Sequence, residues 1–259
     1  MDVYAHNRDV WDRRVAAGDI WTIPVSPEVI AVARRGVVSL LLTPTTVVPA
    51  AWYPPLPGAD VLCLASGGGQ QGPVLAAAGA RVTVLDASPA QLARDREVAA
   101  REQLDLTTVQ GNMADLSAFP DGSFDLIFHP VSNCYAPAVR PVWRECARVL
   151  RSGGTLLAGF NNSVVYIFDE EALWERGEMT VRWRLPYADV DSLPPDKLAS
   201  RIEQGEAVEY SHTLQELIGG QCDAGLLIAG MYEDRWSGEG APVLDAYFPW
   251  FIATRAVKP

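Results

Sequence analysis

Cysteine and histidine are scarce in this sequence, with four cysteines and three histidines among 259 residues. They show no spacing typical of a disulfide framework or of a zinc or iron site, so we expect no bound metal. The opening segment, MDVYAHNRDVWDRR, is too charged for a secretory signal. These absences favour a reduced, cytoplasmic protein. The cysteines are Cys63, Cys134, Cys146 and Cys222.

Long apolar runs and clustered positive charge are also absent. The longest strongly apolar stretch, 37–42, is interrupted by Ser39 and is far shorter than the roughly 20 residues that span a bilayer. Lysine and arginine number 21 against 32 acidic residues, which gives a formal net charge of −11. Nucleic-acid binding needs clustered cations. We therefore expect neither a membrane nor a nucleic acid as partner, and take a small molecule as the default.

The sequence is rich enough in apolar residues, at 49%, to bury one large core, so we expect a single domain over 1–259. Its first 58 residues contain two helical candidates, near 3–17 and from Ser26-Pro27-Glu28 to about residue 42. Ser26 is a suitable cap and Pro27 suits the first helical position. Five prolines make 43–58 a stiff connector. We expect 1–58 to form a helical lid.

From residue 59 onward, apolar strands alternate with helices, which is typical of a parallel sheet covered on both faces. The fold class is therefore α/β, doubly wound. The expected strands are 60–65, 81–86, about 106–110, 124–129 and 154–159, and the expected helices are 73–79, 89–103 and 137–150.

The alternation stops at residue 161 and resumes near residue 211. A helix at about 212–222 and strands at about 225–235 and 246–257 then complete a core made of 59–160 and 211–259. Within 161–210, the stretches MTVRWRLPY and AVEYSHT alternate like half-buried strands. We expect an inserted β cap over the substrate, because ligands bind at the carboxyl ends of parallel strands. The alternative is a hairpin without ligand contact.

The segment 61–86 indicates a nucleotide site. It reads as a strand, a glycine-rich turn, a short helix and a second strand that ends on Asp86. A carboxylate about 20 residues after such glycines can accept hydrogen bonds from both ribose hydroxyls, so we expect an adenosine-containing cofactor. The run GGGQQG also matches the dinucleotide pattern, which leaves an NAD(P)-dependent oxidoreductase open. Pro73 weighs against it, since pyrophosphate needs backbone donors at that helix start.

Further segments carry a family resemblance. VLCLASGGG (61–69), GNMADL (111–116), DGSFDLIFHP (121–130) and RVLRSGGTLLAGF (148–160) resemble, in order and spacing, the class I S-adenosylmethionine (SAM)-dependent methyltransferases, in particular the type 11 small-molecule group. The resemblance implies a mostly parallel seven-stranded sheet whose last strand is antiparallel, SAM as cofactor, and methyl transfer to a small organic acceptor. Cys63 and Ala65 depart from the family pattern, which keeps a SAM-binding protein without turnover as an alternative.

The resemblance also implies roles for individual residues of this chain. Asp86 would bind the ribose, the turn from Ala65 would pass under the methionine part of SAM, and Asn112 would hold adenine through its amide oxygen. Glycine is expected at Gly67 and Gly69 because a Cβ there would hold the ligand off the backbone. The expected cofactor contacts are Ala65, Ser66, Gly67, Gly69, Gln70, Asp86, Ala87, Ser88, Asn112, Met113, His129, Pro130 and the lid residue Trp11.

Methyl transfer from a sulfonium is an in-line displacement that requires alignment and exclusion of water, and a general base is optional. His129 stands at the carboxyl end of the fourth strand and is the candidate base, although a role in lining the methionine pocket is favoured over it. Asn133 and Tyr135 are expected to orient the acceptor, with Trp183 of the insertion as an apolar wall. The other two histidines have expected roles outside the chemistry: His212 as a helix start and His6 as an exposed residue.

Overall fold

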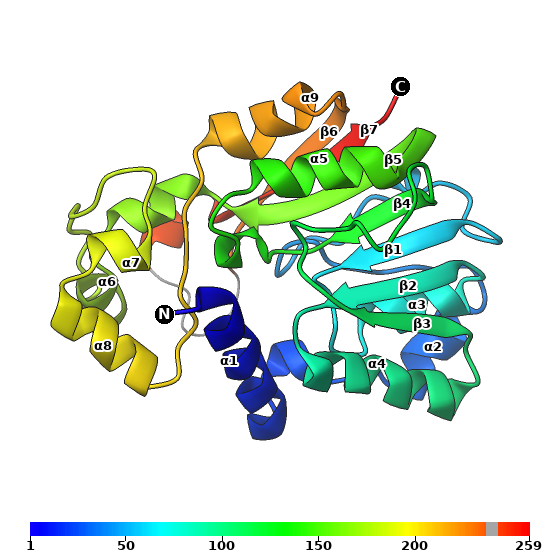
Figure 1. Cartoon of the computed structure of the whole chain (residues 1–259), viewed down its shortest axis with the longest axis horizontal. Coiled ribbons are helices and arrows are strands. Elements are labelled where there is room, and N and C mark those ends of the chain that lie inside the picture. The colour runs from blue at the N-terminus through cyan, green and yellow to red at the C-terminus, as the bar shows by residue number, and fades with distance from the viewer. Residues whose placement is uncertain (237–242) are drawn as a thin grey trace.

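A computed structural model describes residues 1–236 and 243–259 and contains one seven-stranded sheet (Figure 1). The strand order is β3-β2-β1-β4-β5-β7-β6, with parallel pairing from β3 to β5. β7 is antiparallel to both of its neighbours. The α/β class and the antiparallel last strand are therefore confirmed. The strands are β1 Asp60–Leu64, β2 Arg81–Asp86, β3 Leu106–Gln110, β4 Phe124–His129, β5 Leu150–Asn161, β6 Leu227–Asp234 and β7 Phe251–Val257.

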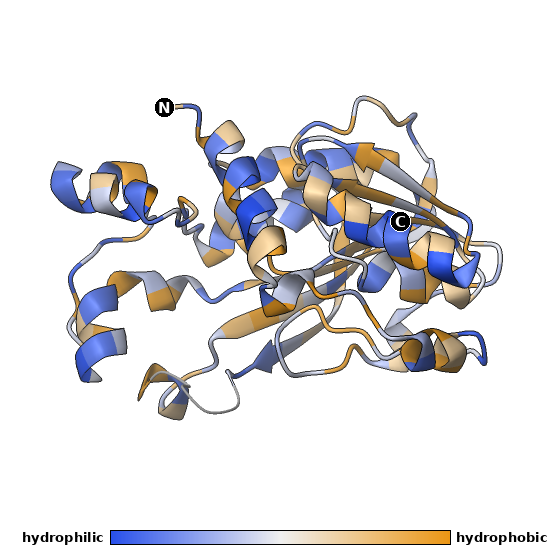
Figure 2. Ribbon diagram, turned by 90° about the horizontal axis from the view of Figure 1, so that it is seen from below, coloured by the Kyte–Doolittle hydropathy of each residue, from blue (hydrophilic) through white to orange (hydrophobic). Residues whose placement is uncertain are grey.

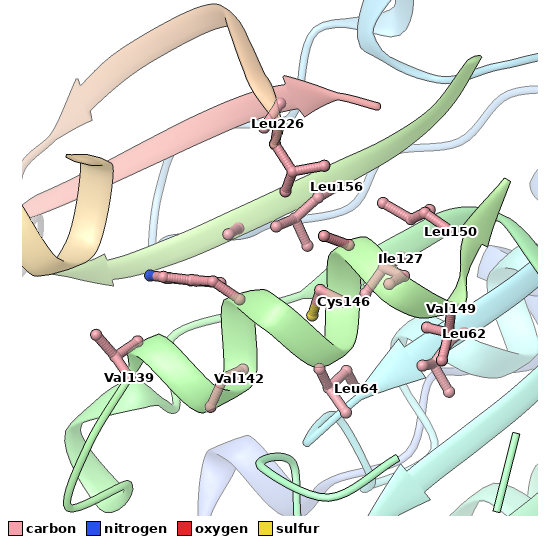
Figure 3. Close-up of a cluster of buried hydrophobic side chains, with 14 of the residues drawn as sticks. Leu62, Leu64, Ile127, Val139, Val142, Cys146, Val149, Leu150, Leu156 and Leu226 are labelled. Atoms are coloured by element: carbon pink, nitrogen blue, oxygen red, sulfur yellow. The ribbon is translucent and has the colours of Figure 1, made fainter. Parts of the chain in front are cut away.

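The strands carry apolar side chains at consecutive positions, and these side chains point to both faces of the sheet. Helices cover both faces and bury them. In β1, Val61 and Cys63 pack with α2, α3 and α4, whereas Leu62 and Leu64 pack with α5 on the opposite face (Figure 3). Figure 2 shows the strands as predominantly hydrophobic and the helices as mixed. The helices are α2 Pro27–Ala33, α3 Gln71–Ala77, α4 Pro89–Glu102, α5 Arg140–Val149 and α9 Gly220–Asp223, the last preceded by a π-helical turn, Gln215–Gly219.

The second N-terminal helix is shorter than predicted. α2 ends at Ala33 because Gly36, at φ +82°, turns the chain out of the helix. The apolar residues 37–42 then run extended beneath the sheet, where the Leu42 carbonyl occupies the space that a Cβ on Gly159 would need. Pro27 takes the first helical position as predicted, but the Ser26 side chain makes no capping hydrogen bond.

The insertion at 161–210 is helical, so the predicted β cap is wrong in its secondary structure. It contains α6 Glu170–Arg176, α7 Asp189–Ser192 and α8 Pro195–Glu203. The stretch 179–187 pairs only through an isolated bridge between Phe168 and Val181, and Val181 is 65% exposed. An alternating segment needs a neighbouring strand to complete its hydrogen bonds, and none lies beside this one within the described residues. In Figure 1 this helical cap stands beyond the carboxyl ends of the strands.

The N-terminal helix α1, Val3–Ala17, forms where it was predicted and lies between the cap and α4 (Figures 1 and 2). Asp2 caps its start through the Ala5 amide, and Gly18 ends it in the left-handed region. Within the described part of the chain, no helix has the length and apolarity needed to cross a membrane.

Candidate active site

A cavity of about 1320 Å³ opens where the core, α1 and the helical cap meet. Pockets for a single small ligand typically measure about 300–1,000 Å³. The cavity is therefore large enough for two ligands side by side. One end is formed by the turn after β1 and the end of β2, and the other by aromatic and acidic residues of the cap.

The turn after β1 has an unusual backbone. Ala65 is in the left-handed region at φ +48°, as are Gly68 and Gly69 at φ +116° and +72°. The Ala65 amide donates to the Leu85 carbonyl at 2.7 Å, which holds the turn against the end of β2. Residues Ala65, Ser66 and Gly67 of this turn line the cavity.

Packing within the protein already requires glycine at Gly67 and Gly69. A Cβ on Gly67 would lie 2.7 Å from the Gln91 Cβ, and a Cβ on Gly69 would lie 2.8 Å from the Arg94 carbonyl oxygen. Both obstacles belong to α4. Glycine is thus required at both positions because the turn packs directly on that helix.

Asp86 is held rigidly at the end of β2. Its two carboxylate oxygens accept hydrogen bonds from the Gly67 and Ser88 amides, each at 2.9 Å. Burial raises the pKa of this carboxyl, and these amides lower it in part. The carboxylate lines the cavity, where its remaining lone pairs can accept bonds from two hydroxyls. Nearby, Gln91 also lines the cavity, and its buried Oε1 has no partner among the described residues. This end therefore fits a polar ligand that carries a ribose.

Most residues predicted for the cofactor do line the cavity. Asn112 is exposed at its edge, and its Oδ1 accepts the Ala114 amide at 2.9 Å. Ser88 does not line it, because its hydroxyl donates to Asp12 and caps α4. Gly69 and His129 do not line it either. The predicted residues that do are Ala65, Ser66, Gly67, Gln70, Asp86, Ala87, Asn112, Met113, Pro130 and Trp11.

His129 is fully buried, with both ring nitrogens occupied. Nδ1 lies 2.8 Å from the Leu64 carbonyl oxygen, to which it donates, and burial lowers the pKa of the ring. A neutral ring that donates from Nδ1 must accept a hydrogen bond at Nε2. The side-chain amide of Asn133, 2.9 Å away, therefore turns its N–H group rather than its oxygen toward Nε2. The structure thus separates His129 from the cavity and leaves it no free nitrogen to act as a base.

Two of the three expected acceptor residues line the cavity, namely Tyr135 and Trp183. Asn133 is instead buried beside His129. Tyr135 packs edge-on against Trp11 of α1, with ring centroids 5.7 Å apart. Sequence reasoning missed Glu209 and Tyr166, which also line this end. Glu209 lies in AVEYSHT, where only the alternation was considered.

α1 is anchored at both sides of the cavity. Its buried Asn7 exchanges two hydrogen bonds with the Val208 backbone, at 2.9 and 2.8 Å, and Asp12 accepts from the Ser88 hydroxyl at 2.6 Å. His6 is part-buried against the Glu206 carbonyl, so its expected exposure is wrong. The buried His212 lies 3.1 Å, through Nε2, from the Asn133 carbonyl, and the helix start is capped by the next residue, Thr213.

The arrangement of histidine, cysteine and acidic side chains bears on whether a metal could bind. No group of three or more histidine, cysteine, aspartate or glutamate side chains in the described ranges has the geometry to hold a metal ion.

Comparisons with known proteins bear on this site. A family model described as "Methyltransferase domain" matches residues 62–158. The methyltransferase YbaJ of Bacillus subtilis (strain 168) is 50% identical over 254 residues, which cover 98% of each chain. Two SAM-dependent methyltransferase structures share the fold, each with a TM-score of 0.60. The Mesorhizobium loti protein is 20% identical over 80% of this chain and 94% of its own. The Listeria monocytogenes protein is 18% identical over 81% and 95%.

These matches agree with the cavity's geometry. The family model spans the glycine turn, Asp86 and the end of β4, which are the parts of the chain that form the ribose end of the cavity. The full-length similarity to YbaJ extends the match over α1 and the cap. The chain belongs to the class I SAM-dependent methyltransferases, and its cofactor is S-adenosylmethionine.

Proposed function

We propose that this methyltransferase acts on a small organic acceptor bound between α1 and the helical cap. The observation that carries the proposal is that one cavity contains both the Asp86 end and the cap end. The cap end is walled by rings, including Trp174 against Trp250 and Trp183 against Tyr187, with centroids 6.0 and 5.9 Å apart. Such walls suit an acceptor with apolar surface and exclude water from the reaction.

The chain's own residues bind and align the reactants. SAM supplies an activated methyl group on a sulfonium. Asp86 fixes the ribose, and the turn at Ala65–Gly67 supports the methionine part. α1 encloses the cavity through Trp11, which packs against Tyr135 of the loop after β4. Proximity and alignment of this kind contribute up to about 7–11 kcal/mol in favourable intramolecular reactions, so no metal is required for the transfer.

We further propose that the protein works in the cytoplasm and that its acceptor is neutral or basic. Four free cysteines, three of them buried, are consistent with a reduced cytoplasmic environment. The excess of acidic residues supports a neutral or basic acceptor over a nucleic acid or another phosphorylated one.

Calorimetry with S-adenosylhomocysteine (SAH) and NADPH tests the cofactor half of this proposal. We expect SAH to bind and NADPH not to bind. Asp86→Ala removes charge-assisted bonds to the ribose and should weaken SAH binding by more than about 1 kcal/mol. Asp105→Ala, at an exposed carboxylate outside the cavity, is the matched control. Unchanged affinity in Asp86→Ala would contradict the assigned role.

Transfer of a labelled methyl group from SAM to a panel of small phenols, alcohols, amines and thiols tests the acceptor half. A methylated product detected by mass spectrometry supports it. Tight SAH binding without product over the whole panel would favour the alternative, a SAM-binding protein without turnover.

A further inference from the structure

Three side chains at the cap end of the cavity form a continuous polar chain. Asn161, at the end of β5, donates from Nδ2 to the Tyr166 hydroxyl at 2.7 Å. That hydroxyl donates to the Glu209 Oε2 at 2.8 Å. All three residues line the cavity. The chain of bonds fixes one oxygen of the carboxylate, while Oε1 accepts no hydrogen bond from a described residue.

The backbone around Glu209 is fixed as well. Its amide donates to the Asp189 Oδ2 at 2.7 Å, and the Asp189 amide donates to the Glu209 carbonyl at 3.0 Å. These bonds join the segment around Glu209 to α7. The carboxylate therefore has a defined position before any acceptor binds, as efficient proton transfer requires.

Glu209 differs in charge environment from the acidic residues of the cap that pair with Arg201 or Lys197. Glu170, Asp189 and Glu206 share Arg201, and Glu171 pairs with Lys197. Glu209 has no ion pair within the described residues. Burial raises its pKa to about 7, although the Tyr166 hydrogen bond and Arg201 favour the ionised form. A carboxylate with these properties can accept a proton and release it again near neutral pH.

We propose that Glu209, oriented by Tyr166 and Asn161, is the general base for an acceptor that loses a proton on methylation, namely a hydroxyl or an amine. The inference rests on the proposed function. In the transfer, the oxygen or nitrogen lone pair forms the new bond to the methyl carbon. The sulfur–methyl bond breaks and its electron pair stays on sulfur. The acceptor proton moves to the Glu209 carboxylate and then to water.

Other groups near the acceptor are less suited to this step. His129 lies outside the cavity with both ring nitrogens engaged. Burial raises the pKa of the Tyr135 hydroxyl well above its usual range, so it stays protonated and can only donate a hydrogen bond or accept one weakly. At this end of the cavity, Glu209 thus combines a carboxylate oxygen that accepts no hydrogen bond from a described residue with a pKa near neutrality.

Glu209→Gln tests the proposal in the intact protein, because the amide keeps an acceptor oxygen but cannot take the proton. With a methylated phenol or amine from the panel, we expect kcat to fall by about 10²–10⁴-fold while KM changes little. Wild-type kcat should decline below an apparent pKa near 7, and this decline should disappear in the variant. SAH affinity, measured by calorimetry, should be retained. Glu203→Gln, an exposed position on α8 outside the cavity, is the matched control.

Tyr166→Phe separates the positioning role from the base. It removes a hydrogen bond that stabilises the ionised carboxylate, so the acidic decline of kcat should move to higher pH with a smaller loss of rate. Turnover of Glu209→Gln within threefold of wild type would overturn the proposal. So would methylation confined to thiols, since a thiolate reacts without a base of this kind.

Failure of the proposed function is distinguishable from failure of this inference. If SAH binds and no panel compound is methylated, the small-molecule function has failed. The Glu209 carboxyl is then followed by carbon NMR of SAH-loaded protein with labelled glutamate, using Glu209→Gln to assign its resonance. Ionisation near pH 7 supports the inference, and ionisation near pH 4 overturns it.

Discussion

At the scale of single residues, Ala65 stores backbone strain at the cofactor turn. An L-residue in the left-handed region costs about 1–2 kcal/mol, and glycine avoids most of this cost. With Ala65 at φ +48°, Ala65→Gly should raise the free energy of unfolding by about 1 kcal/mol. Urea unfolding of the wild type and the variant measures this change in the free energy of unfolding. Gly68→Ala should have the opposite effect, because a Cβ there would lie 3.0 Å from the Trp21 carbonyl oxygen. A loss of stability in both variants would contradict the assigned strain.

Asp95, beneath the same turn, should make stability depend on pH. Its Oδ2 accepts the Gly68 amide at 3.0 Å, but its Oδ1 is buried without a partner. Burial raises the pKa of this carboxyl to about 8, despite bonds from the Gly69 and Gly68 amides. The folded protein thus holds it protonated at neutral pH, whereas the unfolded chain ionises it near 3.9. The stability linked to this proton is fully present below about pH 4 and is lost as the pH rises towards 8.

Asp95→Asn keeps the shape of the side chain and removes the ionisation. Relative to wild type, the variant should therefore gain free energy of unfolding between pH 5 and pH 8, by more than about 1 kcal/mol. Urea unfolding of both proteins at pH 5, 6.5 and 8 measures this difference. A difference that does not change with pH would show that Asp95 ionises in the folded protein as it does in the unfolded chain.

Residues of the cofactor end could be predicted because the groups that contact them lie close to them in the sequence. Asp86 and the Gly67 amide that it accepts are 19 positions apart, within one strand–turn–helix–strand unit. Glu209 depends on Tyr166, which lies 43 positions earlier in an insertion without a recognisable pattern. His129 was misassigned for a related reason. Its position at a strand end is readable from the sequence, but the direction of its ring is set by packing against Leu64 and Asn133.

At the scale of elements, α1 connects the cap to the core. Asn7 holds it to Val208 of the cap, and Asp12 holds it to the start of α4. α1 also lines the cavity, so we expect a ligand inside to leave faster when these contacts are weakened. The strength of these contacts should therefore set the rate at which the cavity opens.

Asn7→Ala removes two hydrogen bonds and leaves the Val208 backbone groups unpaired, at a cost of about 2–3 kcal/mol to this contact. We expect faster amide exchange in α1 and around residues 206–208, and faster SAH dissociation, with the central strands unchanged. Hydrogen exchange and stopped-flow displacement measure these effects. Asp9→Ala, on the exposed side of α1, is the matched control. Equal exchange in both variants would show that α1 is held elsewhere.

Elements whose own sequence pattern is regular were predicted within a few residues, as α1 and β1 to β4 illustrate. The helices of the cap were not predicted. Alternating side chains over 179–187 are compatible with a strand, but they do not show whether a neighbouring strand exists to pair with it. In the structure, Arg182 of this stretch pairs with Asp169 at the start of α6, and Val181 faces solvent. Pairing is a tertiary property, which a single segment does not encode.

At the scale of the whole molecule, the cavity lies where the three parts of the chain meet. The core contributes the turn after β1 and Asp86, α1 contributes Trp11, and the cap contributes Trp183 and Glu209. The order of strands that brings them together could be predicted, because alternating strands and helices permit few topologies and the family resemblance selects one. A ligand at the Asp86 end lies against the core and α1, and α1 is hydrogen-bonded to the cap, so its binding should stabilise the whole chain.

A thermal unfolding experiment tests this expectation. A ligand that binds only the folded state adds about 2.7 kcal/mol at a concentration of 100 times its Kd, which for a domain of this size corresponds to a rise in Tm of about 5–10 °C. We expect SAH to produce this rise in a single transition, because α1 and the cap unfold together with the core that they contact. NADPH at the same concentration should produce none, and the SAH concentration needed should be several-fold higher for Asp86→Ala. A second transition unaffected by SAH would show instead that the cap unfolds independently of the ligand.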